Sequence, residues 1–350
     1  MKDFIHIAYC FDKNYEQHAA VSIFSLLNKA KTQKIFLHLV SYKITNTFQA
    51  FLEDIKKKFD FHYKYYDFEP RKLSYLKKYY SNYISIFAYV RLFVCDLVAN
   101  DTNKLIYLDS DTIVLDDISD LYYLNLDNNY IAQTLDYNPY MKNKISVNAY
   151  FNSGVILFNV SRWINENITE QLLKYESKNK DRIYIGEQCL LNLFFENKIL
   201  KLEKKYNYFI LSGSNQKLVD SSKAKIIHYI TAIKPWKKYF DNENLIHYQS
   251  NLHHTIYKDN KPDEPYSLLE YKHYANYLLK RKDYKTSLTI IVNILLKLKE
   301  VEPDKINQIS ELQFKGEKLL FEGKQIETIE LYKKFLDLKW GTSDFPESFK

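Results

Sequence analysis

The first sixty residues alternate short apolar runs with amphipathic segments, and this alternation limits the fold more than any other feature. Residues 4–11 and 35–40 are apolar runs of the length typical of buried strands. Residues 19–30 and 47–59 carry apolar side chains at helical spacing. Because strands that alternate with helices form right-handed βαβ units, the sequence predicts an α/β fold with a mostly parallel sheet.

The positions of the glycines exclude two common nucleotide-binding motifs. The chain has 350 residues but only six glycines, and the first is Gly154. A Walker loop and a dinucleotide fingerprint both need glycines where the backbone approaches phosphate. A nucleotide bound in the amino-terminal part would therefore be held by metal and side chains.

Two aspartates follow a third apolar run, residues 105–108. Asp109 and Asp111, with Ser110 between them, leave this expected strand and need a cation, donors or water. Mg²⁺ or Mn²⁺ binds few protein carboxylates and keeps positions for water and substrate phosphates. A simple turn is the alternative, and the pattern alone does not decide. Since ligands bind at the carboxyl ends of parallel strands, we expect Asp12 at the same edge of the sheet.

Two basic or titratable residues could complete such a site. His228 lies in an expected strand, residues 226–230, and a lone histidine is more often a core residue than a ligand. If that strand reaches the same edge, His228 adds an imidazole to the two carboxylates of an octahedral site. Arg91 lies in apolar sequence leading into an expected helix and needs an anionic partner. A structural salt bridge and a phosphate contact are equal alternatives for it.

Polar residues also mark three later segments. Asp136 ends a short expected strand that begins at Ile131. Residues 151–159 read as a polar turn feeding a strand, with Gly154 where the backbone must come close to another group. Glu187 lies in the first turn of an expected helix, where the helix dipole alone accounts for a carboxylate.

Charge and cysteine content narrow the partners. Lys and Arg number 50 against 43 Asp and Glu, a mild excess that fits anionic substrates or a membrane surface and does not indicate a nucleic-acid binder. The three cysteines show no Cys-x-x-Cys spacing, which argues against a disulfide framework or a zinc cluster. Without a signal peptide or an 18-residue apolar stretch, we expect a soluble cytoplasmic protein.

Taken in order, these motifs resemble glycosyltransferase family 8, the retaining bacterial lipopolysaccharide galactosyl- and glucosyltransferases related to glycogenin. The resemblance spans roughly residues 4–240 and implies a GT-A nucleotide-diphospho-sugar transferase fold, a mostly parallel sheet flanked by helices. In that family the residues matching Asp109, Asp111 and His228 bind Mn²⁺, or Mg²⁺, together with the donor diphosphate.

The resemblance also implies roles for other positions. Asp12, Asn14 and Tyr15 match residues that hold uridine, and Arg91 and Lys234 match residues facing the phosphates and the donor sugar. The implied donor-binding residues are Asp12, Asn14, Tyr15, Arg91, Ser110, Asn152 and Lys234. The implied catalytic residues around the transferred hexose are Asp136, Glu187 and Gln188, with Asn152 also beside the sugar.

Two departures from the family pattern concern the sugar and the diphosphate. The family's Asp-Gln-Asp is Glu187-Gln188-Cys189 here, so a carboxylate that helps to fix the sugar is missing and the accepted hexose stays open. The glycine usual three residues after the metal histidine is Thr231, which restricts backbone approach near the diphosphate.

The implied activity is metal-dependent retaining transfer of galactose or glucose from a UDP-sugar to a glycan, lipooligosaccharide or glycoprotein acceptor. We favour front-face attack, in which the leaving phosphate oxygen takes the acceptor proton and Gln188 or Asp136 stabilises the sugar cation. Double displacement through Asp136 or Glu187 stays open. The alternative function is a catalytically impaired nucleotide-binding partner in a glycan assembly complex, which Cys189 favours and the intact ligand triad opposes.

The last third of the chain lies outside the resemblance. We expect a catalytic domain at 1–241, a polar connector at 242–265 and a helical region at 266–350. Residues 275–288 match residues 316–329 at an offset of 41, as in tetratricopeptide helix pairs, although we favour a plain helical bundle. Residues 270–300 carry a net charge of +4, which a solvated face explains; a weak peripheral contact with the inner face of a membrane is the alternative.

Overall fold

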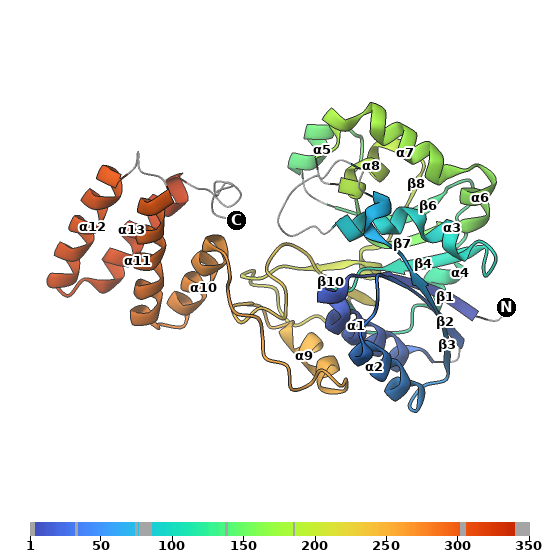
Figure 1. Cartoon of the computed structure of the whole chain (residues 1–350), viewed down its shortest axis with the longest axis horizontal. Helices are drawn as coiled ribbons and strands as arrows, with labels where there is room; N and C mark the ends of the chain where they lie inside the picture. The colour runs from blue at the N-terminus through green and yellow to red at the C-terminus, as the bar shows by residue number, and fades with distance from the viewer. Residues whose placement is uncertain are drawn as a thin grey trace. The chain divides into compact units, whose positions relative to one another are not determined.

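The computed structural model describes residues 4–31, 34–73, 76, 86–136, 139–184, 186–301 and 306–339 (Figure 1). It divides into two compact units. The first unit comprises residues 1–211, 215–232 and 242–260, and the second comprises 212–214, 233–241 and 261–350. Within the described ranges, no helix combines the length and the apolar character needed to cross a membrane.

A seven-stranded sheet forms the centre of the first unit, in the order β3-β2-β1-β4-β7-β6-β8. Its strands are β1 (Phe4–Cys10), β2 (Lys34–Ser41), β3 (Phe61–Asp67), β4 (Lys104–Leu108), β6 (Ile131–Leu135), β7 (Phe151–Asn159) and β8 (Ile199–Leu202). β7 runs antiparallel to β4 and β6, and all other pairs are parallel. The predicted mostly parallel α/β sheet is therefore confirmed.

Helices cover both faces of this sheet (Figure 1). The helices of the first unit are α1 (Glu16–Lys29), α2 (Asn46–Lys56), α3 (Val94–Val98), α4 (Ser119–Tyr123), α5 (Pro139–Ile145), α6 (Val160–Asn165), α7 (Ile168–Lys178), α8 (Gly186–Phe194) and α9 (Leu245–His253). Short 3-10 helices are η1 (Lys13–Tyr15), η2 (Pro70–Leu73), η3 (Ile86–Phe93), η4 (Lys180–Arg182) and η5 (Lys204–Tyr206). Neighbouring strand residues such as Ile106 and Tyr107 enter different hydrophobic clusters, because alternate side chains point to opposite faces.

A second, three-stranded sheet has the order β5-β10-β9, with β5 (Thr112–Val114), β9 (Tyr208–Ile210) and β10 (Ile226–Tyr229). β10 runs antiparallel to β5, which pairs His228 with Thr112. Because β5 begins directly after Asp111, this small sheet brings a histidine from late in the chain beside the two aspartates.

The apolar segment around Arg91 leads into a helix, as expected, because the 3-10 helix η3 is followed directly by α3. Arg91 Nε donates to Ala88 O over 3.0 Å. One local expectation was wrong: residues 151–159 form β7 throughout, so the expected polar turn before this strand is itself extended.

The second unit contains two helix pairs: α10 (Leu268–Lys280) with α11 (Tyr284–Val301), and α12 (Ile306–Phe321) with α13 (Gln325–Lys339). Equivalent contacts recur at the offset of 41. Ser287 Oγ donates to Ala275 O in the first pair, and Thr328 Oγ1 donates to Gly316 O in the second. These matching contacts favour a repeat of two helix pairs over the plain bundle.

The segment expected as a connector is partly helical. Residues 245–253 form α9, and residues 242–260 group with the first unit. The hydroxyl of Tyr248 lies 2.7 Å from His18 Nδ1 of α1. Part of the first unit is therefore formed by residues beyond 241. The expected division into a catalytic domain, a connector and a helical region with separate functions stays a prediction.

Two buried histidines join the parallel strands of the first unit. His6 Nδ1 lies 2.9 Å from His38 Nε2, and His38 Nδ1 lies 2.9 Å from the hydroxyl of Tyr66, which donates to Asp101. Burial, reinforced by neighbouring His6, lowers the pKa of His38 from 6.5 to about 3. His38 is therefore neutral in the folded protein at ordinary pH.

The depressed pKa of His38 predicts a pH-dependent stability. Between pH 6.5 and 3 the unfolded chain binds a proton at His38 and the folded chain does not, so the free energy of unfolding falls as the pH falls through this window. The slope is roughly 1.4 kcal/mol per pH unit. Between pH 6.5 and 4.5, the free energy of unfolding of a His38→Gln variant should therefore fall by about 2 kcal/mol less than that of the wild type. Urea unfolding measures this, with exposed His62→Gln as control; equal pH dependence of the His38→Gln variant and the wild type would contradict the prediction.

Candidate functional site

The polar residues of the site follow strands that end at one edge of the main sheet. Asp109 follows β4 and Asp12 follows β1, and these strands are parallel neighbours, so both residues lie at the carboxyl edge as expected. The Asp109 backbone is fixed on two sides. Its N–H donates to Gly154 O over 2.8 Å, and its carbonyl accepts from the Thr112 hydroxyl over 2.7 Å.

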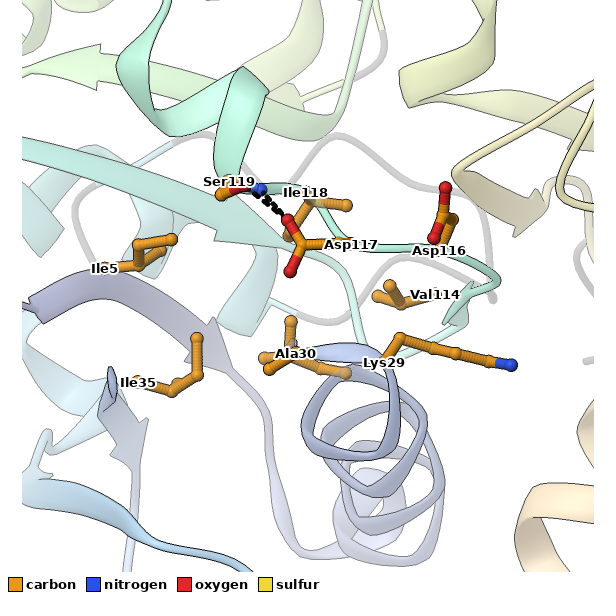
Figure 2. Close-up of a pocket in the computed structure, with 10 residues that line it drawn as sticks. Ile5, Lys29, Ala30, Ile35, Val114, Asp116, Asp117, Ile118 and Ser119 are labelled. Carbon is orange, nitrogen blue, oxygen red and sulfur yellow. Dashed lines mark hydrogen bonds between the residues drawn. The ribbon is translucent and has the colours of Figure 1, made fainter. Parts of the chain in front are cut away.

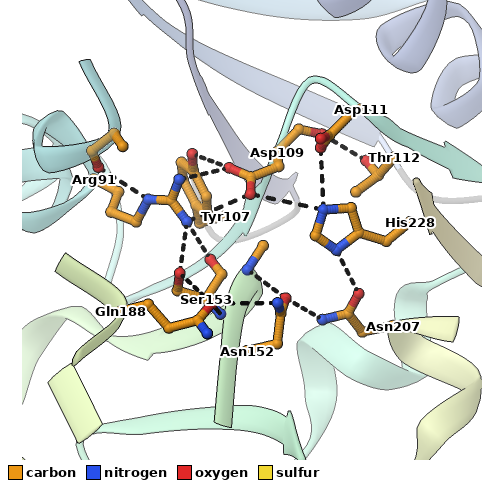
Figure 3. Close-up of polar contacts among 12 residues, drawn as sticks. Arg91, Tyr107, Asp109, Asp111, Thr112, Asn152, Ser153, Gln188, Asn207 and His228 are labelled. Carbon is orange, nitrogen blue, oxygen red and sulfur yellow. Dashed lines mark hydrogen bonds and ion pairs between the residues drawn. The ribbon is translucent and has the colours of Figure 1, made fainter. Parts of the chain in front are cut away.

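Asp109, Asp111 and His228 form a carboxylate–imidazole cluster at this edge (Figure 3). One potential ligand atom from each residue lies within 4.8 Å of the other two. His228 Nε2 lies 3.1 Å from Asp111 Oδ1 and 3.9 Å from Asp109 Oδ2. The structure thus brings together the three residues that the sequence marked as metal ligands.

The donor atoms of this cluster fit a divalent metal. Asn207 Oδ1 lies 2.9 Å from His228 Nδ1 and accepts a hydrogen bond from it, so Nε2 is the ring nitrogen that faces the two carboxylates. Carboxylate oxygens and a ring nitrogen that converge in this way favour a cation among them. Carboxylate oxygen and imidazole nitrogen are ligands for Mn²⁺ and Mg²⁺, so the residues fit the metal that the sequence implies.

Arg91 binds the opposite side of the Asp109 carboxylate. Its side chain is buried, with Nη2 2.9 Å from Asp109 Oδ1 and Nε 3.4 Å from Glu187 Oε1. Burial opposes its charge, but Asp109, Tyr107, Glu187 and Cys10 together outweigh this effect, so the pKa of Arg91 is raised. Burial raises the pKa of Glu187, which Arg91 partly offsets. The salt-bridge alternative for Arg91 is therefore observed, and a phosphate contact stays a prediction.

Tyr107 and Ser153 complete the surroundings of Arg91. The Tyr107 hydroxyl donates to Asp109 Oδ1 over 2.6 Å, and the Arg91 guanidinium lies 4.8 Å from the centre of its ring. Arg91 Nη1 donates to Ser153 O over 2.6 Å and to Ser153 Oγ over 3.0 Å. Asp109 is therefore held by hydrogen bonds and charge on the side away from His228.

The residues expected around the hexose also lie together. Gln188 Nε2 donates to Asp136 Oδ2 over 3.2 Å, and Gln188 Oε1 accepts from Asn152 Nδ2 over 3.2 Å and from Ser153 N over 3.1 Å. Ser153 Oγ lies 3.3 Å from Glu187 Oε1. The amide oxygen of Gln188 thus already accepts two N–H groups from β7.

The residues expected to hold the nucleotide are distributed over both units. Asp12 Oδ1 accepts from Asn14 N over 2.9 Å and caps η1, and the Tyr15 ring packs edge-on against His18. Among the described residues, the buried Ser110 hydroxyl has no hydrogen-bond partner. Lys234 belongs to the second unit, in residues 233–241, and its role toward a phosphate stays a prediction.

The two departures from the family pattern have clear local structures. Thr231 has a φ of 76°, a conformation that is rare for a β-branched residue and that glycine adopts easily. Cys189 is fully buried, and its Sγ lies 3.5 Å from the Tyr150 hydroxyl. This position contributes to the core of the first unit.

Sequence reasoning missed Asn207, Ser153 and Tyr107. Asn207 follows η5 in a stretch without a motif, and only the pairing of β9 with β10 brings it to His228. Tyr107 and Ser153 read as ordinary strand residues. The one signal that pointed here was Gly154, whose close approach to another group is confirmed.

A small recess lies elsewhere, where β1 and β2 begin (Figure 2). Ile5 and Ile35 line it with Ala30, Asp116 and Asp117. Asp117 is engaged locally, because its carboxylate accepts from Ser119 N and from Lys31 N. Within the described chain, none of the predicted site residues lines this recess, so it is separate from the site at the carboxyl edge.

Gly154 predicts how tightly the cluster is packed. A Cβ atom at this position would lie 2.2 Å from His228 Cε1 and 2.9 Å from Asp109 Oδ2. Gly154→Ala must therefore displace His228, and we expect Mn²⁺ affinity to fall at least about tenfold, at a stability cost of about 1–3 kcal/mol. Mn²⁺ titration measures the affinity. Gly323→Ala is the control for a loss of stability alone, because it strains a φ of 75° but brings its Cβ within 4 Å of no described atom. Unchanged affinity of Gly154→Ala would contradict the geometry.

Proteins of known activity are similar to this chain over most of its length. The lipopolysaccharide 1,2-glucosyltransferase of Escherichia coli (strain K12) is 26% identical over 296 residues, which covers 80% of this chain and 87% of that protein. The lipopolysaccharide 1,3-galactosyltransferase of Salmonella typhimurium is 28% identical over 252 residues, which covers 67% of this chain and 73% of that protein.

A solved structure and a family profile complete the comparison. The galactosyltransferase LgtC in complex with donor and acceptor sugar analogues has a TM-score of 0.63 at 21% identity, covering 72% of this chain and 96% of that one. This similarity shows that the fold is GT-A. The sequence profile described as glycosyl transferase family 8 matches residues 6–239, more than half of the chain. The chain belongs to glycosyl transferase family 8.

Proposed function

We propose that this glycosyltransferase is a metal-dependent, retaining hexosyltransferase that uses a UDP-sugar. The observation that carries the proposal is the convergence of ligand atoms from Asp109, Asp111 and His228 at the carboxyl edge of the sheet. Similar proteins are named as glucosyl- and galactosyltransferases of lipopolysaccharide. The proposed donor sugar is therefore glucose or galactose, and the acceptor is a glycan, lipooligosaccharide or glycoprotein.

The cluster would hold a divalent metal against the donor diphosphate. Bound there, the metal would supply Lewis-acid stabilisation of the charge that develops on the leaving UDP. Lys234 would add positive charge at the same phosphates. Arg91 already balances Asp109 and Glu187, so its first contribution is to hold the Asp109 carboxylate in place.

The hydrogen bonds around Gln188 assign distinct parts to the sugar-side residues. Its Oε1 accepts from Asn152 and Ser153, so this oxygen is poorly available to a cationic sugar, whereas its Nε2 holds Asp136. Asp136 would therefore stabilise the sugar cation. In front-face transfer the acceptor hydroxyl attacks the anomeric carbon on the side that UDP leaves, and its proton passes to the leaving phosphate oxygen.

Double displacement has one remaining candidate nucleophile. Glu187 is buried and its carboxylate contacts Arg91 and Ser153, so it is poorly placed to attack a sugar. Asp136 is the alternative nucleophile. The rival function, an inactive partner in a glycan assembly complex, rested on Cys189, and the convergence of Asp109, Asp111 and His228 argues against it.

The helical second unit would serve the acceptor side of the reaction. The candidate metal ligands and uridine residues all lie in the first unit. Weak contact with an anionic membrane is a second proposed use, although several basic side chains here are paired. Lys280 and Arg281 both contact Asp241, and Lys297 contacts Glu300.

The donor proposal predicts a specific activity. With Mn²⁺, the protein should hydrolyse UDP-glucose or UDP-galactose, and UDP should raise its melting temperature more than GDP or ADP does.

Asp111→Ala should abolish hydrolysis without unfolding the protein, because the carboxylate lies at the edge of the sheet. Asp116→Ala, which removes a surface carboxylate paired with Lys31, is the matched control. Equal stabilisation by the three diphosphates, or an active Asp111→Ala variant, would refute the proposal.

A further inference from the structure

A row of side-chain amides connects the carboxylate–imidazole cluster with the expected sugar site (Figure 3). Asn207 contacts His228 at one end and Asn152 at the other, with 2.9 Å for each contact. Asn152 contacts Gln188, which contacts Asp136. Asn207 and Asn152 are buried, with 1% and 8% exposure, so water does not compete freely for these bonds. We call Asn207, Asn152 and Gln188 the amide relay.

Backbone groups fix the direction of the Asn152 and Gln188 amides directly, and that of Asn207 through Asn152. Gly154 N donates to Asn152 Oδ1 over 2.9 Å, and Ser153 N donates to Gln188 Oε1 over 3.1 Å. Because a backbone N–H can only donate, both of these side-chain atoms must be oxygens. Asn207 must then present Nδ2 to the Asn152 oxygen, which leaves its Oδ1 for His228.

This direction sets the tautomer of His228. An amide oxygen accepts hydrogen bonds and cannot donate, so His228 Nδ1 carries the proton that Asn207 Oδ1 receives. The other ring nitrogen, Nε2, is the one that faces Asp109 and Asp111. A hydrogen bond to the far nitrogen is the usual means by which proteins orient a metal-binding histidine and raise its basicity.

At its other end, the amide relay orients the side chains of Gln188 and Asp136, which lie at the expected sugar site. With its Oε1 fixed by Ser153 and Asn152, Gln188 turns Nε2 toward Asp136. Reversal of the Asn152 amide would place its oxygen against Gln188 Oε1 and lose this arrangement. The orientation of Asp136 therefore depends on Gln188, whose partner Asn152 is also held by Asn207.

We propose that Asn207 is a positioning residue that joins the two halves of the site. Its oxygen holds His228 as a metal ligand, and its N–H₂ group holds Asn152, and through it Gln188 and Asp136, in the geometry for sugar transfer. The second half of this inference rests on the proposed function; the first half concerns the histidine alone.

Two variants of Asn207 separate these two contacts. Asn207→Leu removes both and should weaken Mn²⁺ binding about 10- to 100-fold. Asn207→Asp keeps an oxygen for His228 but cannot donate to Asn152. It should keep Mn²⁺ affinity within about threefold of wild type and lower kcat for UDP-sugar hydrolysis at least about tenfold at saturating Mn²⁺. Free Mn²⁺ measured by electron paramagnetic resonance, without nucleotide, gives the affinity, and steady-state kinetics give kcat and KM.

Asn192→Asp controls for the loss of a buried amide. Asn192 bonds the Phe151 backbone through both ends of its side chain. This variant should lower the melting temperature and leave Mn²⁺ affinity unchanged. If Asn207→Leu folds and binds Mn²⁺ with wild-type affinity, the metal half of the proposal is overturned. If Asn207→Leu does not fold, a tenfold loss of Mn²⁺ affinity in Asn207→Asp overturns the metal half instead. Asn207→Asp with wild-type kcat would overturn the sugar half. Wild-type protein that binds Mn²⁺ but hydrolyses no UDP-sugar would defeat the proposed function and the sugar half, while the metal half would still be decided by affinity.

Discussion

The buried ion pair between Arg91 and Asp109 is the interaction on which the site depends. A carboxylate at the end of β4 could not stay ordered beside a second aspartate without a fixed positive charge, and Arg91 supplies one at 2.9 Å. The hydroxyl of Tyr107 and the carbonyl of Gly154 hold the same residue. One side of the Asp109 carboxylate is thereby bound by Arg91 and Tyr107, and the other side faces His228.

Charge alone would not organise the opposite side of the cluster. There the structure uses uncharged amides, which transmit orientation without adding a second charge. Asn207 lies between His228 and Asn152, and β7 supplies the backbone N–H groups that set its direction. The metal side and the sugar side of the site are therefore supported by the same strand, which pairs with β4 and β6 at the centre of the sheet.

Much of this could be predicted because the information is local. Apolar periodicity predicted the first strands and helices, and polar residues after an apolar run marked Asp109 and Asp111 as candidate ligands. His228 was a further candidate, which the family resemblance favoured. Contacts between distant segments could not be read from the sequence. Asn207 acquires its role only when β9 pairs with β10. The start of β7 looked like a turn because Asn, Ser and Gly are common in turns, whereas its pairing with β6 makes it a strand.

The central claim is that the cluster of Asp109, Asp111 and His228 is a metal site that binds the donor diphosphate. Anomalous X-ray diffraction from crystals soaked with Mn²⁺ and UDP tests it most directly. The account predicts one strong manganese peak within bonding distance of Asp109, Asp111 and His228 Nε2, with the diphosphate on its open side. A nucleotide bound without a peak at these residues, or a manganese ion bound elsewhere against the diphosphate, would contradict it.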